Sequence, residues 1–212
     1  MADQILEQSL QQFLGTLASG APTPGGGSVA AVTGAMAAGL LTMVCDLTIG
    51  KKTYAEFEDE ARGLRERAEA SRAALQQLAQ DDIEIFGHLA AAYKLPKATE
   101  ADAASRRAAI QTVTKQAAEV PLRIARAVAD LVPLCAPLAR RGSRLAVSDV
   151  GVAAHLIKAA LPSALLNVDI NLAALEDQRF VRETRAVIED ITVGIDDELD
   201  GVLAIVGERI QQ

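Results

Sequence analysis

Eleven positions between residues 54 and 89 follow one another in alternating steps of three and four residues. This spacing places their side chains along one side of an α-helix, and it predicts a helix of about forty residues over 51–94. Nine of the eleven are apolar, and the polar exceptions are Ser71 and Asp82. A carboxylate on an apolar stripe is unfavourable unless it is paired, hydrogen-bonded or neutral. Asp82 is therefore a candidate catalytic residue, and a buried structural acid that caps another element explains it equally well. The positions are Tyr54, Phe57, Ala61, Leu64, Ala68, Ser71, Leu75, Leu78, Asp82, Ile85 and Leu89.

Helical spacing continues over most of the remaining chain. The composition agrees with it, because half of the residues are hydrophobic but only 3% are aromatic, which favours helix over sheet. We therefore expect an all-α fold, with residues 1–212 forming a single domain built as a bundle of six to seven helices, two of them long.

Several residue types mark where these helices begin. Ser28 is expected to cap a helix that runs to about residue 48, and Ser148 with Asp149 to cap another. Pro121 is expected at the first turn of a new helix, since proline is tolerated there. Asp177 is expected to cap one last long helix that continues to the C-terminus.

The second predicted helix contains Val29–Cys45, 17 residues without a charge. That length lies at the lower limit for a membrane span. Small residues such as Gly34 and Ala38 recur four apart in it, which favours close packing at the centre of a bundle. No second uncharged stretch is expected to span a membrane, and the favoured interpretation is a buried helix rather than an integral membrane protein.

Charge and cysteine content narrow the possible functions. The net charge is −7, which argues against nucleic-acid binding because that function needs clustered Lys and Arg. Cys45 and Cys135 are 90 positions apart, so they form neither a disulfide framework nor a metal motif. His88 and His155 lie in no cluster with zinc-ligand spacing, and no metal site is expected. The N-terminus lacks the basic region of a signal peptide, and a cytoplasmic protein is expected.

A proline- and glycine-rich loop precedes the second predicted helix. Free backbone N–H groups at such a helix start can bind an anionic group, but a tight loop that lets two helices pack explains the same residues equally well. The spacing matches neither a phosphate-binding P-loop nor a dinucleotide-binding fingerprint. The candidate binding residues are Thr23, Pro24, Gly25, Gly26, Gly27 and Ser28.

Three further groups of polar residues stand out. Lys51 and Lys52 lie at the junction of two predicted helices, where a solvated surface is the commoner explanation. Asp149 lies at a predicted helix start. Asn167 and Asn171 are four residues apart and therefore share one helix face, where interhelical hydrogen bonds are the simpler role.

Read in order, these segments resemble the cyclodeaminase/cyclohydrolase family, which contains formiminotetrahydrofolate cyclodeaminases and bacterial methenyltetrahydrofolate cyclohydrolases. The resemblance covers nearly the whole chain, and the Pro-Gly loop together with Gly50-Lys51-Lys52 is its most specific part. Thr53 departs from the pattern, since close relatives often carry a third lysine there, and this weakens an expected contact with an anionic tail. The matching segments are Ala21–Ser28, Leu47–Tyr54, Asp81–Asp82 with Phe86, Ala92–Lys97, Ser148–Val152 and Leu166–Val168.

The resemblance implies an all-helical homodimer that binds a tetrahydrofolate derivative near the subunit interface and needs no cofactor beyond that substrate. Hydrolysis of 5,10-methenyltetrahydrofolate to 10-formyltetrahydrofolate is the expected reaction. One alternative is the cyclodeaminase reaction, which releases ammonia. A second alternative is a non-catalytic protein that binds folate or a partner helix.

For hydrolysis, Asp82, Lys51 and Asp149 are the expected catalytic residues. A carboxylate at position 82 or 149 would stabilise the cationic ring and take a proton from water, and a lysine would donate a proton or hold the opened oxygen. The expected substrate-binding residues are Thr23, Pro24, Gly25, Gly26, Gly27, Ser28, Lys52, Lys94 and Asn167.

Overall fold

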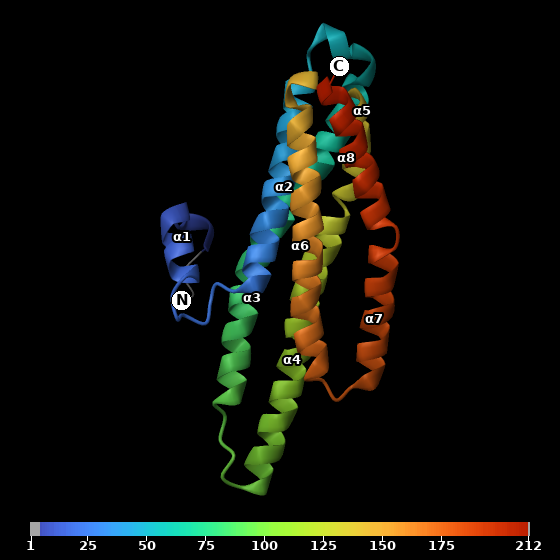
Figure 1. Ribbon diagram of the computed structural model, residues 1–212. Coiled ribbons are helices and arrows are strands. Elements are labelled where there is room, and N and C mark those ends of the chain that lie inside the picture. Colours follow the sequence, from blue (N-terminus) through green and yellow to red (C-terminus); the bar gives the residue numbers. More distant parts are fainter. Residues whose placement is uncertain (1–4, 212) are drawn as a thin grey trace.

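A computed structural model describes residues 5–211, so residues 1–4 and 212 of the expected domain lie outside the described part (Figure 1). Every regular element in that part is helical, which confirms the all-α prediction, and helices α2–α8 form the bundle. The α-helices are α1 (Leu10–Leu17), α2 (Gly26–Thr48), α3 (Glu58–Tyr93), α4 (Glu100–Ala129), α5 (Val132–Arg141), α6 (Val147–Ala173), α7 (Gln178–Thr192) and α8 (Ile195–Gln211). Short 3₁₀ helices are η1 (Ile5–Glu7), η2 (Lys52–Phe57) and η3 (Arg144–Ala146).

The longest predicted helix begins later than its spacing suggests. α3 starts at Glu58 and has 36 residues, while η2 precedes it with a non-helical Tyr54 (φ −116°). The Tyr54 hydroxyl accepts a hydrogen bond from the backbone N–H of Arg144 at 2.9 Å. This contact with a segment 90 residues away holds the chain out of a regular helix at this point.

Two predicted helix boundaries are wrong. Pro121 does not open a new helix but lies inside α4, which continues to Ala129. The predicted last helix is two helices, α7 and α8, because Gly194 adopts φ +75° between them, a left-handed conformation that glycine adopts without strain. Asp177 does cap α7, and its carboxylate accepts hydrogen bonds from the N–H groups of Arg179 and Phe180.

Two predicted caps are also corrected. α2 begins at Gly26 with Gly25 in the capping position, so Ser28 lies in the first turn, where its hydroxyl has a different partner. α6 begins at Val147 with Ala146 in the capping position, so Ser148 and Asp149 lie inside its first turn. An acidic Asp149 there is favourable toward the helix dipole.

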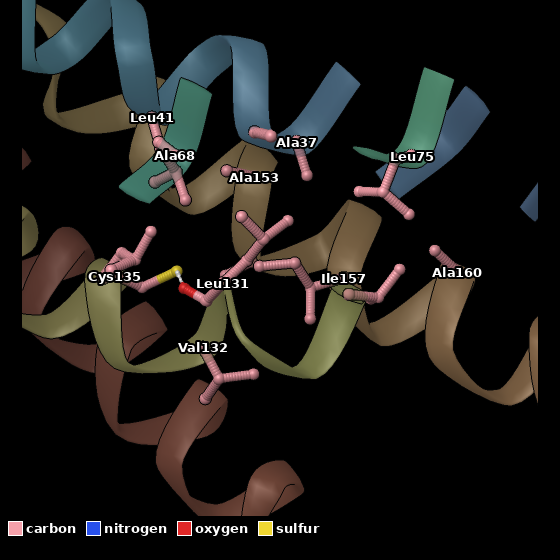
Figure 2. Close-up of a cluster of buried hydrophobic side chains, with 14 of the residues drawn as sticks. Ala37, Leu41, Ala68, Leu75, Leu131, Val132, Cys135, Ala153, Ile157 and Ala160 are labelled. Carbon is pink, nitrogen blue, oxygen red and sulfur yellow. Dashed lines mark hydrogen bonds between the residues drawn. The ribbon is translucent and has the colours of Figure 1, made fainter. Parts of the chain in front are cut away.

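α2 lies at the centre of the bundle, as its small residues predict, and packs along α3 and α6. At Gly34 an added Cβ would come within 2.7 Å of Val128 Cγ2, so glycine permits the close approach of α4. Figure 2 shows the core beside α2, where side chains of α2, α3, α5 and α6 meet around Leu131 and Ile157. Small alanines alternate with larger aliphatic residues, which lets these helices interdigitate.

Two helical segments are long and apolar enough to cross a membrane by length and composition, Gly26–Thr48 and Arg144–Ala173. The second corrects the expectation that no further stretch would qualify. In the bundle, 56% and 50% of their apolar windows are buried against other helices, as in the core helices of many bundles.

Candidate functional site

A cavity of about 420 Å³ opens where the start of α2 meets α3, α4 and α6. Its wall is mixed, with polar groups near the start of α2 and on α6 and an apolar surface along α3. Thr114 and Ile170 also line the cavity, and the sequence analysis missed both because each looks like an ordinary helix residue. The lining residues are Pro22, Thr23, Gly25, Gly26, Gly27, Asp82, Ile85, Phe86, Leu89, Tyr93, Thr114, Ala117, Asn167, Ile170, Asn171 and Ala174.

The glycine-rich loop brings the backbone of α2 against the Asp82 carboxyl group. A Cβ added at Gly27 would lie 2.1 Å from Asp82 Oδ1 and 2.6 Å from its Cγ, so only glycine fits at this position without moving the acid. The Ser28 hydroxyl donates a hydrogen bond to Asp82 Oδ2 at 2.8 Å. The loop therefore allows a carboxylate to approach a helix N-terminus closely.

Asp82 has an unusual environment for an acid. Burial raises its pKa above the ordinary value of 3.8, and the hydroxyl and backbone hydrogen bonds from Ser28 counteract this rise in part. A raised pKa makes the carboxylate a better proton acceptor when it is ionised. The neighbouring Asp81 has a structural role instead, because Gln77 and Arg123 both donate hydrogen bonds to its carboxylate.

The α6 side of the cavity carries two amides. A Cβ at Gly26 would lie 3.2 Å from Asn167 Nδ2, so Asn167 sits directly beside the start of α2. Its Nδ2 donates to the carbonyl of Ser163 at 2.8 Å. Asn171, one turn later, also lines the cavity. Asn167 and Asn171 therefore share one face of α6, as their spacing predicts, and both line the cavity.

Backbone groups complete the polar surface. The first N–H groups of a helix have no acceptor within that helix. Among residues 5–211, no acceptor takes a hydrogen bond from the N–H groups of Gly26 and Gly27. They lie at the positive end of the dipole of α2, a 23-residue helix. The cavity thus offers N–H donors on one side and a carboxylate beside them.

The other predicted catalytic residues lie at the opposite end of the bundle. Lys51 and Lys52 follow the C-terminus of α2, about 33 Å from its start at 1.5 Å per residue. Asp149 lies in the first turn of α6, about 27 Å along that helix from Asn167. A single copy of the chain therefore does not bring Lys51, Lys52 or Asp149 together with Asp82.

Some of the remaining predicted binding residues line the cavity and others do not. Thr23, Gly25, Gly26 and Gly27 line the cavity, whereas Pro24 is buried beside it. Ser28 acts on the cavity through Asp82. Lys94 is exposed just after α3 ends and is not part of the cavity lining, although the preceding Tyr93 is.

The described residues contain no group of three His, Cys, Asp or Glu side chains that could hold a metal ion. His88 and His155 are exposed on α3 and α6. Burial raises the pKa of the Cys45 and Cys135 thiols to about 12, so neither forms a nucleophilic thiolate near neutral pH. The candidate chemistry therefore centres on the carboxyl group and the backbone at the start of α2.

The fold and the site define an all-helical bundle protein in which a half-buried carboxylate lies against a Pro-Gly helix start. The chain belongs to the formiminotransferase-cyclodeaminase family, whose model matches residues 9–190. It is 41% identical over 208 residues to the methenyltetrahydrofolate cyclohydrolase of Methylorubrum extorquens, and the match covers 97% of this chain and 95% of that protein.

Two other relatives carry cyclodeaminase names. The formiminotetrahydrofolate cyclodeaminase of Thermotoga maritima has a crystal structure that superposes with a TM-score of 0.82 at 32% identity and covers 98% of both chains. The formimidoyltransferase-cyclodeaminase of Rattus norvegicus is 34% identical over 187 residues, but the chain spans only 35% of its length. The expected family is confirmed.

Proposed function

We propose that this protein hydrolyses 5,10-methenyltetrahydrofolate to 10-formyltetrahydrofolate in one-carbon metabolism. The observation that carries the proposal is the 41% identity to a methenyltetrahydrofolate cyclohydrolase over nearly the full length of both proteins. The reaction needs no cofactor beyond the folate substrate, and the protein would work in the cytoplasm.

The cavity supports this chemistry. The substrate ring is an amidinium-like cation, and an ionised Asp82 stabilises such a charge. Water forms a bond to the bridging carbon, and its proton passes to the Asp82 carboxylate. The carbon–N5 bond then breaks, N5 takes up a proton, and the former bridging carbon remains on N10 as a formyl group. The added hydroxyl gives up its proton as the formyl C=O forms. One water molecule is consumed and one proton is released, because the substrate ring is a cation and the formyl product is not.

The start of α2 is suited to stabilise the oxygen atom that water adds to the bridging carbon. As water adds, this oxygen becomes a more polar alkoxide-like group before it becomes the formyl oxygen. The free N–H groups of Gly26 and Gly27 lie at the start of α2, where Gly27 adjoins Asp82 and Gly26 adjoins Asn167, and they can donate hydrogen bonds to this oxygen. The acid and the oxygen-binding donors therefore come from the same contact between α2 and α3.

The active form would be a homodimer formed through α2 and α6. These two helices run side by side in opposite directions, because Gly26 adjoins Asn167 at one end and Thr48 accepts the Ser143 N–H at the other. Their outer surface carries exposed Met36, Leu166 and other apolar residues that the described part of the chain leaves uncovered. A second copy would bury them. The exposed apolar residues of this face are Met36, Met43, Leu47, Val152, Leu166 and Ile170.

An antiparallel arrangement of two copies would also bring together the predicted site residues that lie far apart within one chain. It places the Lys51 end of one copy next to the Asp82 cavity of the other, because these features lie at opposite ends of the same face. Lys51 would then donate a proton or a hydrogen bond to the oxygen of the opened ring, and Asp149 would stabilise the cationic ring. Lys52 and Lys94 would bind the anionic glutamate tail. Each site would contain residues from both copies.

Subunit mixing tests this arrangement. Asp82→Asn and Lys51→Met variants are each expected to lose activity as homodimers. After the two are unfolded together and refolded, half of the dimers are mixed, and one site in each mixed dimer is unaltered, so about a quarter of wild-type activity returns. If all site residues came from one chain, the mixture would stay inactive. Each variant unfolded and refolded on its own is the control.

A substrate comparison tests the reaction. Purified protein is given 5,10-methenyltetrahydrofolate, and loss of the near-ultraviolet absorbance of the ring is followed against the buffer rate. In parallel it is given 5-formiminotetrahydrofolate, and ammonia is assayed. Fast loss of absorbance without ammonia establishes the cyclohydrolase. Ammonia release would support the second candidate, the cyclodeaminase, which the Thermotoga maritima match favours. If the folded protein gives neither signal, the remaining alternative is a non-catalytic folate-binding protein.

A further inference from the structure

Pro121 creates a gap in the hydrogen bonding of α4. In a regular helix the N–H of residue 121 would donate to the carbonyl of Ala117, but proline has no N–H. Both residues are buried, so the solvent around the bundle has little access to this carbonyl. A buried acceptor of this kind needs a partner from elsewhere in the fold.

Asn171 of α6 supplies that partner. Its Nδ2 donates to the Ala117 carbonyl at 2.9 Å and to the Asn167 carbonyl at 2.8 Å. Both amide hydrogens are engaged, and both partners are acceptors, so the nitrogen must face them and the oxygen must face the other way. Ala117 and Asn171 both line the cavity. The gap left by Pro121 thus determines how an amide is oriented in the cavity wall.

The Asn171 oxygen is left available by this arrangement. Among residues 5–211 no group donates a hydrogen bond to Oδ1, and this oxygen is not one of their fully buried atoms. An acceptor held rigidly in a cavity wall pairs best with an N–H donor on a ligand, and it disfavours ligands that leave it unpaired. The start of α2, with its N–H donors, presents the opposite polarity.

We propose that Asn171 determines specificity by accepting a hydrogen bond from an N–H or amino donor on the ring of the bound ligand. The proposal rests on the proposed function, under which the ligand has a reduced pteridine ring with an amino group and ring N–H donors. The carbonyl freed by Pro121 keeps the amide in the orientation that this recognition requires.

The Pro121→Ala substitution separates the ligand contact from the structural role. Alanine restores an N–H at residue 121 that can bond the Ala117 carbonyl, so the carbonyl no longer depends on Asn171. Asn171→Ala alone loses both roles. Loss of one hydrogen bond to the ligand raises the KM for 5,10-methenyltetrahydrofolate and the Kd for 5-formyltetrahydrofolate about tenfold, with kcat within about threefold of wild type. The unpaired carbonyl lowers Tm by about 3–6 °C.

The double variant Asn171→Ala/Pro121→Ala decides between the roles. We expect its Tm to return to that of Pro121→Ala alone, while its Kd, measured by titration calorimetry with 5-formyltetrahydrofolate, stays about tenfold weaker than that of Pro121→Ala. If the Kd also returned, Asn171 would act only through the helix, and the proposal would be overturned. An unchanged Kd in Asn171→Ala would overturn it as well.

Gln111→Ala is the matched control. Gln111 is another amide that joins α4 to the end of α6, since it donates to the Ala174 carbonyl and accepts from the Glu176 N–H, but it does not line the cavity. Its loss should lower Tm without weakening ligand binding. A tenfold weaker Kd in this variant would show that any loosening of α4 against α6 impairs binding, which would overturn the specific role of Asn171.

Failure of the proposed function gives a different result. If wild-type protein binds 5-formyltetrahydrofolate but does not hydrolyse the methenyl substrate, the proposed reaction is refuted, and the calorimetric series still tests Asn171. If wild-type protein hydrolyses the substrate and the Asn171 variants bind normally, only the inference about Asn171 is refuted. Absence of both binding and turnover would refute both.

Discussion

Gly27→Ala gives the sharpest test of the contact between α2 and Asp82. The added methyl group would lie 2.1 Å from Asp82 Oδ1, and an ordinary contact needs about 3.4 Å, so the carboxylate must withdraw by at least about 1.3 Å. A shift of about 1 Å in a catalytic group lowers turnover roughly 100-fold. We therefore expect kcat for 5,10-methenyltetrahydrofolate to fall about 100-fold.

The effect of Gly27→Ala on stability should be much smaller. Displacement of Asp82 weakens its hydrogen bonds from Ser28, each of which contributes about 1.5–3 kcal/mol when the acceptor is charged. Alanine favours the helix by about 1 kcal/mol over glycine, and water entering the cavity solvates the displaced acid. The net loss is about 1–3 kcal/mol, which leaves the protein folded.

The assay compares Gly27→Ala with Gly39→Ala in the same helix. At Gly39 the nearest atom to an added Cβ is Arg72 Cδ at 3.9 Å, so alanine fits there. We expect Gly39→Ala to be as active as wild type and slightly more stable in thermal unfolding. Wild-type kcat in Gly27→Ala would refute the reasoning, because Asp82 would then not need to lie against the start of α2 during turnover.

Other predictions concern protonation and buried polar groups. Because Asp82 must be ionised to take a proton and its pKa is raised, kcat/KM should fall as pH is lowered through a pKa above 3.8. A raised pKa stabilises the fold at low pH and loses this contribution as pH rises, so Asp82→Asn, which is expected to abolish turnover, should be at least as stable as wild type at pH 7 by thermal unfolding. Thr48→Ala leaves the buried N–H of Ser143 unpaired and should cost about 1–3 kcal/mol in urea unfolding. Cys45 and Cys135, with pKa values of about 12, should resist iodoacetamide until the protein unfolds, as mass spectrometry would show.

Most helices of the fold could be predicted from sequence because their apolar residues recur at helical spacing over many turns. The errors occur where a distant partner overrides a local rule. Pro121 normally disfavours a helix interior, but here Asn171, fifty residues later, compensates for the missing hydrogen bond. Tyr54 fits the spacing of α3, but its contact with Arg144 keeps it out of that helix. Neither partner can be identified from the surrounding residues.

The candidate site could be predicted only in part for the same reason. Asp82 stood out because a carboxylate is unusual on an apolar stripe, and the Pro-Gly loop stood out because it cannot continue a helix. That these two features touch depends on the packing of α2 against α3, which spacing alone does not define. The resemblance grouped Lys51 and Asp149 with Asp82, whereas the distances along α2 and α6 separate them within one chain.

The central position of α2 also has a consequence for how the chain is made. α2 ends at Thr48, and α6, which covers one side of it, begins 99 residues later at Val147. At about 5–20 residues per second, a ribosome needs about 5–20 s to make that intervening stretch. During this interval α2 is a charge-poor apolar helix whose α6 side is still without its partner, although α3 and α4 are made meanwhile. Ribosome-associated chaperones have time to bind it, and the bundle core can close only after most of the chain has been translated.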